Sequence, residues 1–149
     1  MVILFINEEK RDHMIICEIG LNHMGNIKYA NEYIDKIIKS KADGILFHIR
    51  EKSFYDTNPK LLLPDRFYVD AIKKVKKHKI KFGITLADPN KIEFCKKIGV
   101  DFYKIFSRDI LEQKILSKIK LTKKITFVST GMSNLNEIKK FVNIIKSEI

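Results

Sequence analysis

Short apolar segments of strand length alternate along the whole chain with longer segments that carry apolar residues at helical spacing. The short segments are rich in β-branched and aromatic residues, which favours strands. Alternation of strand and helix indicates a parallel sheet covered by helices. We therefore predict one domain of about five consecutive βα units, with strands at 14–19, 44–49, 80–85, 102–107 and 125–129.

Residues typical of helix ends support this order. Pro89 directly follows Asp88, as the first residue of a helix follows its cap. Gly99 is placed to close the same helix, and Ser133 is the predicted start of the last one. The apolar positions of the five expected helices lie within 34–38, 67–75, 92–98, 110–119 and 135–145.

Two architectures agree with this pattern, an open doubly wound sheet and part of a (β/α)8 barrel. A complete barrel takes about 250 residues, whereas this chain has 149 and supplies five of the eight units. Composition and periodicity do not choose between the two.

The charge of the chain is strongly positive, with 29 Lys and Arg against 18 Asp and Glu, or +11. Lysine dominates this excess, Trp is absent, and the basic positions lack the interleaved arginine and aromatic residues of nucleic-acid surfaces. We predict solvent-exposed lysine faces and no nucleic-acid partner. The charge would still attract a small anionic substrate.

Neither membrane insertion nor secretion is indicated. No run of about 18 apolar residues could cross a bilayer, and the first residues lack the basic region of a signal peptide. Cys17 and Cys95 are too few for a disulfide framework. A cytoplasmic protein without a membrane partner is predicted.

Polar and ionisable residues follow the expected strands, where α/β proteins gather their functional groups. Glu18 and Lys104 interrupt apolar strands, and an unpaired charge there is costly. We predict a polar site that these two residues share. The strand ends also carry His48, Arg50, Thr85, Asp88, Ser107, Asp109, Ser129 and Thr130.

Two readings of Lys104 stay open at this point. Lys104 and Ser107 suit one phosphate or carboxylate, but the lysine could equally pair with Asp101 or Asp109. Ser129 and Thr130 precede Gly131, which allows a ligand close to the backbone and is also ordinary turn chemistry.

The histidines favour structural roles over metal binding. His23 and His48 stand alone, and neither His-x-x-x-His nor Cys-x-x-Cys spacing occurs. A self-contained metal site is not predicted. Glycine-rich nucleotide-binding loops are also absent from the sequence.

Three segments resemble motifs of the sialic acid synthase (N-acetylneuraminate synthase) family. Residues 16–25 resemble its opening Glu-Ile-Gly-x-Asn-His-Asn-Gly motif, residues 99–107 its fourth-strand signature, and residues 129–133 its fifth-strand Ser-Thr-Gly-Met-Ser. The resemblance runs from about Met14 to the C-terminus, in matching order. It implies the N-terminal part of a TIM barrel.

The resemblance also implies a reaction. Phosphoenolpyruvate condenses with an N-acylated amino sugar of the N-acetylmannosamine type, giving a nonulosonic acid and phosphate. A divalent metal, Mn or Mg, is implied, with ligands outside this chain. Glu18 and Asp109 would be catalytic, and the substrate-binding residues would be Thr85, Lys104, Ser107, Ser129 and Thr130.

The sequence departs from the family at several places. Leu46 stands where the family has a phosphoenolpyruvate-binding lysine, with Arg50 and His48 as candidate replacements. Met24 and Arg108 also replace family residues. Strands six to eight and an antifreeze-like domain are expected to be absent, so we predict an incomplete barrel with two exposed parallel edges that forms a homo-oligomer or needs a complementary chain.

The leading prediction is a sialic acid synthase-like chain that is inactive alone, and two alternatives remain. One is a non-catalytic remnant that binds an anionic ligand or a partner chain. The other is a different phosphoenolpyruvate-dependent sugar-acid synthase.

Overall fold

A computed structural model describes the backbone of residues 2–7 and 12–146, and the side chains from residue 14 to residue 146. In these residues six strands form one sheet, in the order of the sequence. The strands are β1 (Val2–Asn7), β2 (Asp12–Gly20), β3 (Gly44–Ile49), β4 (Lys81–Leu86), β5 (Phe102–Ile105) and β6 (Ile125–Val128).

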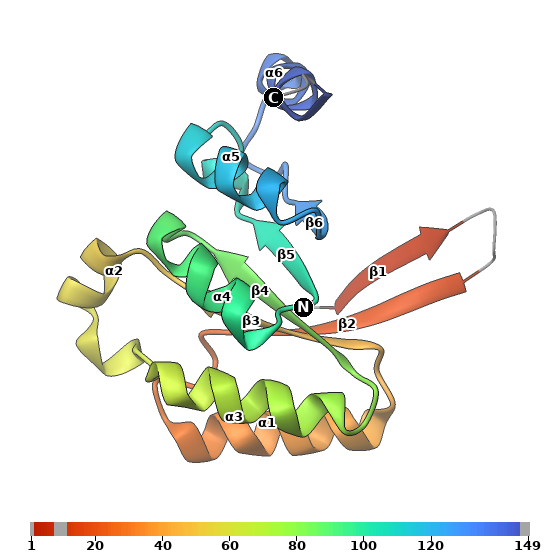
Figure 1. Cartoon of the computed structure of the whole chain (residues 1–149), viewed down its shortest axis with the longest axis vertical. Helices are drawn as coiled ribbons and strands as arrows, with labels where there is room; N and C mark the ends of the chain where they lie inside the picture. The colour runs from red at the N-terminus through yellow and green to blue at the C-terminus, as the bar shows by residue number, and fades with distance from the viewer. Residues whose placement is uncertain (1, 8–11, 147–149) are drawn as a thin grey trace.

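Strands β2 to β6 run parallel and curl into a half-barrel, with helices around the outside (Figure 1). The predicted partial TIM barrel is thereby confirmed, and the open doubly wound sheet is excluded. The main helices are α1 (Ile27–Ser40), α3 (Asp65–Lys76), α4 (Ile92–Ile98), α5 (Gln113–Leu121) and α6 (Leu135–Lys146).

The main core lies between the outer face of the sheet and the helices. Phe47 on β3 stacks on Phe82 of β4, with ring centroids 5.7 Å apart, and meets the edge of Phe67 on α3 at 5.4 Å. Ile34 on α1 and Val75 on α3 are completely buried in the same core. Each such side chain contributes about 1.5–3 kcal/mol when it leaves water.

The inner face carries a second, smaller apolar cluster. Ile16, Leu46 and Phe102 are its buried members, one each from β2, β3 and β5. Gly83 makes room for them on β4, since a Cβ there would lie 2.1 Å from the Phe102 ring. This cluster forms a floor inside the half-barrel, below the carboxyl ends of the strands.

The N-terminal edge differs from the prediction. Strand β1 pairs antiparallel with the first six residues of β2, from Val2 opposite Cys17 to Asn7 opposite Asp12. The expectation of two exposed parallel edges is therefore wrong on this side. Among the described residues, β6 forms the other edge of the sheet.

The helix boundaries also correct two predictions. Asn134, not Ser133, caps α6, because its side chain accepts hydrogen bonds from the backbone N–H groups of Asn136 and Glu137. Helix α5 begins at Gln113, after the short helical turn η3 (Ser107–Asp109), and not near residue 110.

Two short helices after β3 were not predicted, α2 (Lys52–Thr57) and η1 (Pro59–Leu61). In the described part of the chain, no helix is long and apolar enough to cross a membrane.

Candidate functional site

A row of polar residues lies directly above the apolar floor. His48, Thr85 and Lys104 are partners in register on β3, β4 and β5. His48 follows Leu46 by two residues, Thr85 follows Gly83, and Lys104 follows Phe102. Because side chains alternate along a strand, these three residues also face the inside of the half-barrel. The row therefore lies nearer to the carboxyl ends of the strands.

Glu18 reaches Lys104 across the inside of the half-barrel. Strands β2 and β5 are three places apart in the sheet, about 14 Å if it were flat. Even so, Lys104 Nζ donates to both carboxylate oxygens of Glu18, at 2.9 and 3.0 Å. Both side chains are only 7% exposed, so the curl of the sheet is what brings the charges together.

The pairing of Lys104 with a nearby aspartate does not occur. Asp101 accepts a hydrogen bond from the Phe82 backbone N–H and lies 3.3 Å from Lys76 Nζ. Asp109 has Arg108 as its ion-pair partner, at 3.5 Å. Lys104 is thus held by a carboxylate 86 residues away.

His48 is the third member of this cluster. The sequence favours a structural role for it over metal binding and offers it, with Arg50, as a candidate replacement for the family lysine. Its Nε2 lies 2.8 Å from Glu18 Oε1. Burial raises the pKa of Glu18, but hydrogen bonds from His48 and Lys104 outweigh it, so the pKa lies below its usual value. The position of His48 two residues after Leu46 is the one signal that places it on the inner face.

Thr85 is the residue of this row whose side chain lacks a hydrogen-bond partner within residues 14–146. The residue is completely buried, and its Oγ1 has no hydrogen-bond partner among the residues that the structure describes. A buried hydroxyl without a partner is costly. Lys104 has three N–H donors, and Glu18 supplies acceptors for two. An oxyanion between these two residues would complete the bonding of both.

The other predicted substrate-binding residues lie at the rim. Ser107 begins η3 and is half-buried, and its carbonyl accepts a hydrogen bond from the Ser133 hydroxyl at 3.4 Å. Ser129 follows β6 and is also half-buried, whereas Thr130 is exposed. The structure shows no contact that joins these side chains to Glu18 or Lys104.

Asp109 is also at the rim and not in the Glu18 cluster. Its Oδ2 is buried and has no hydrogen-bond partner in the described part of the chain. Burial raises the pKa of its carboxyl group despite the nearby Arg108. A carboxyl group of raised pKa is suited to hold a proton.

His23, in the loop after β2, has the structural role that the sequence favours. Its Nδ1 accepts a hydrogen bond from the Gly25 backbone N–H at 2.9 Å, and its ring packs against Phe47. Gly25 has a φ of +71°, and a Cβ there would collide with the Lys60 carbonyl oxygen. His23 and Gly25 thus hold the loop after β2 close to η1.

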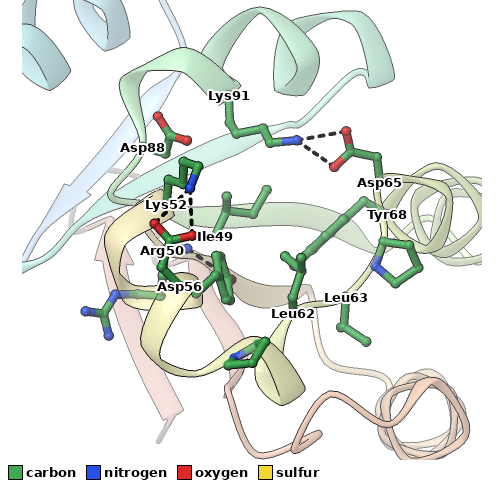
Figure 2. A pocket seen from close by; sticks show the side chains of 13 residues that line it. Ile49, Arg50, Lys52, Asp56, Leu62, Leu63, Asp65, Tyr68, Asp88 and Lys91 are labelled. Atoms are coloured by element: carbon green, nitrogen blue, oxygen red, sulfur yellow. Dashed lines mark hydrogen bonds and ion pairs between the residues drawn. The ribbon is translucent and has the colours of Figure 1, made fainter.

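A cavity of about 660 Å³ lies elsewhere, between the end of β3 and the helices α2 and α3. Four of its ionic side chains are paired with one another, Lys52 with Asp56 and Lys91 with Asp65 (Figure 2). Arg50 directs its guanidinium group away from it. No predicted catalytic or substrate-binding residue lines this cavity.

The side chains of the described residues offer no ready place for a divalent metal. No three His, Cys, Asp or Glu side chains among them gather as ligands. Glu18 and His48 are the only such pair in the cluster, and Glu18 already bonds both His48 and Lys104. These residues do not fit a divalent ion.

A curled parallel sheet, helices around it, and ionisable groups near the strand ends define the class of (β/α)-barrel proteins. Within that class, the sequence model of the NeuB family matches residues 15–149, and the chain belongs to this family. The resemblance to sialic acid synthases is thereby confirmed.

Relatives and solved structures agree with this placement. N,N'-diacetyllegionaminic acid synthase of Campylobacter jejuni is 30% identical, over 89% of this chain and 46% of the relative. Uncharacterized protein MJ1065 of Methanocaldococcus jannaschii is 31% identical, over 89% of this chain and 42% of the relative. The chain thus spans less than half the length of these two relatives.

The fold comparison extends over nearly the whole chain. The crystal structure of N-acetylneuraminic acid synthetase from Leptospira borgpetersenii, in complex with citrate, superposes with a TM-score of 0.80 at 24% identity. The match covers 98% of this chain and 56% of that one.

Proposed function

We propose that this chain forms the phosphoenolpyruvate-binding part of a sialic acid synthase-type enzyme. The reaction is condensation of phosphoenolpyruvate with an N-acylated amino sugar of the N-acetylmannosamine type, giving a nonulosonic acid and phosphate. The observation that carries the proposal is the buried Thr85 hydroxyl, which lacks a partner and stands in register with Lys104.

The proposed roles follow from where each residue lies. Lys104 and Thr85 hold an oxyanion of phosphoenolpyruvate at the inner face, and Glu18 orients Lys104 through two hydrogen bonds beside the reacting centre. From the rim, Ser107, Ser129 and Thr130 complete the binding of phosphate and carboxylate. Asp109, whose pKa is raised by burial, faces the sugar as an acid.

Residues 1–149 are proposed to be the N-terminal portion of a synthase-type (β/α)8 barrel. Catalysis then needs further strands, which the same polypeptide or a partner chain supplies. No step of the proposal passes through the divalent metal that the resemblance implies, because the described residues do not fit one. The cytoplasmic location stays a prediction.

One observation favours a second candidate, an anion-binding protein without catalytic activity. Leu46, where the family has lysine, is completely buried in the apolar floor with Ile16 and Phe102. A charged side chain has no place in that cluster. Of the two candidate replacements, His48 lies in the polar row, whereas Arg50 lies at the rim.

Calorimetric titration with phosphoenolpyruvate tests the proposal. Thr85→Val removes only the unpartnered hydroxyl, so we expect unchanged folding and an affinity about tenfold lower. Lys104→Ala should abolish binding, but it also leaves Glu18 unpaired, which makes Thr85→Val the cleaner variant. Thr57→Val, at an exposed position of α2, is the control. Equal affinity of the wild type and Thr85→Val would contradict the proposal.

A further inference from the structure

The cavity of about 660 Å³ between the end of β3 and the helices α2 and α3 has no part in the proposed function. His48, Thr85 and Lys104, which form the polar row, do not line it. Small-molecule sites typically have volumes of roughly 300–1,000 Å³. The cavity is therefore large enough for a ligand of its own.

The walls of this cavity are largely apolar. Ile49, Leu63 and Tyr68 line it and are at most 4% exposed, whereas Leu62 beside them is 51% exposed. Two prolines of the same segment add further apolar surface. Covering such surface is favourable because it removes apolar groups from water. The walls therefore suit a ligand with an apolar body.

Hydrogen bonds to the end of β3 hold two of these walls in place. The Tyr68 hydroxyl donates to the His48 carbonyl oxygen at 3.2 Å. The Arg50 backbone N–H donates to the Tyr55 hydroxyl oxygen, also at 3.2 Å. Both tyrosines line the cavity. A cavity whose walls are already fixed loses little conformational freedom when a ligand binds.

Two ion pairs neutralise most of the charge at the cavity. Lys52 Nζ donates to both carboxylate oxygens of Asp56, at 2.7 and 2.8 Å. Lys91 Nζ donates to both oxygens of Asp65, each at 2.8 Å. Figure 2 shows these pairs on different sides of the cavity. Neither pair leaves a net charge for a ligand to meet.

Asp88 is the carboxylate in the lining that stays outside these pairs. Its Oδ1 accepts a hydrogen bond from the Asn90 backbone N–H at 2.9 Å, which caps η2. In the described structure no ion pair involves Asp88, because each cation of the lining pairs with another carboxylate. The cavity thus carries a local negative charge in a chain whose net charge is +11.

We propose that this cavity binds an organic cation with an apolar body, whose ammonium group pairs with Asp88. The apolar walls take the body of the ligand, and the Asp88 carboxylate accepts a charge-assisted hydrogen bond from the ammonium group. An anionic ligand would meet the negative charge of Asp88 and would have to separate an ion pair to reach a lysine. The inference stands apart from the proposed function, because it uses no residue of the polar row.

NMR titration of the isotope-labelled chain with three indoles of similar shape tests the proposal. At neutral pH tryptamine is a cation, tryptophol is uncharged and indole-3-propionate is an anion. We expect tryptamine to bind at least about fivefold more tightly than tryptophol, and indole-3-propionate to bind most weakly. The amide signals of Leu62, Tyr68 and Lys91 should shift most. The net positive charge of the chain favours anions, so it cannot produce this order.

The variant Asp88→Asn should abolish the preference for tryptamine over tryptophol. Asparagine keeps a side-chain oxygen that can cap η2, so we expect unchanged folding. Asp35→Asn, which removes a carboxylate paired with Lys74 away from the cavity, is the matched control and should keep the preference.

Each other outcome overturns the inference. Absence of saturable binding would show that the cavity is not a ligand site. Equal affinity for tryptamine and tryptophol, or a preference that persists in Asp88→Asn, would show that Asp88 does not select a cation. Largest shifts at Thr85 and Lys104 would place the ligand at the inner face of the half-barrel instead.

Discussion

Strands β3 to β5 and strand β6 belong to the same sheet but differ sharply in burial. All four residues of β5 are buried, as are five of six in β3 and in β4. No residue of β6 or of α6 is buried. Ile125 on β6 is 58% exposed and Leu135 on α6 is 75% exposed.

The difference in burial shows which neighbours a parallel strand needs in order to be buried. Parallel strands are buried when helices cover the sheet and a further strand lies on each side. β4 has β3 and β5 beside it, whereas β6 has only β5 among the described residues. Apolar side chains at this end therefore lack the cover that their sequence pattern indicates. Substitutions in the two regions should differ accordingly.

The largest effect is expected inside the well-covered region. Glu18→Ala leaves both Lys104 and His48 without their carboxylate, and removing one partner of a buried pair costs about 3–5 kcal/mol. The measurement is the free energy of unfolding in urea. Glu93→Ala, which removes an 80% exposed glutamate paired with Lys96, is the control and should cost below about 1 kcal/mol. Equal costs for the two variants would contradict the burial of the cluster.

Truncation of one apolar side chain in each region should sharpen the comparison. Ile34→Ala empties a completely buried site on α1 and should lower the free energy of unfolding by about 2–5 kcal/mol. Leu135→Ala removes an exposed side chain from α6 and should change it by less than about 0.5 kcal/mol. Similar losses would mean that α6 is covered in solution, for instance by a second chain.

A smaller effect should appear as pH dependence. Burial lowers the pKa of His23 from 6.5 to about 4, so the unfolded chain binds a proton there between these values and the folded chain does not. The stabilisation that comes from neutral His23 is therefore fully present above pH 6.5 and is lost as the pH falls toward 4. The expected loss between pH 7 and pH 5 is about 2 kcal/mol.

Urea unfolding at the two pH values measures this loss. His78, exposed after α3, gives the control variant His78→Gln, which should keep the full dependence. A free energy of unfolding that stays constant from pH 7 to pH 5 would contradict the buried neutral state of His23.

Periodicity was enough to predict the parallel strands and the order of the units. It missed β1 (Val2–Asn7), because no glycine or proline marks a turn before β2. It also missed α2, whose six residues are too few to show a helical period. Local turn chemistry placed the end of α4 at Gly99 correctly.

The site was predictable only in part. The cost of a charge in an apolar strand singled out Glu18 and Lys104, but their 86-residue separation hid the fact that they pair. His48 stands alone in the sequence because its partner, Glu18, comes from another strand. The ion pair between Glu51, at the start of α2, and Arg108, in η3, joins residues 57 positions apart, which sequence spacing does not show.

A crystal structure of the chain with phosphoenolpyruvate tests the central claim most directly. We predict an oxyanion of the ligand within hydrogen-bond distance of both Thr85 Oγ1 and Lys104 Nζ, with the Glu18–Lys104 contact retained. A ligand bound elsewhere, or an empty inner face at saturating phosphoenolpyruvate, would contradict the claim that this polar row is an anion site.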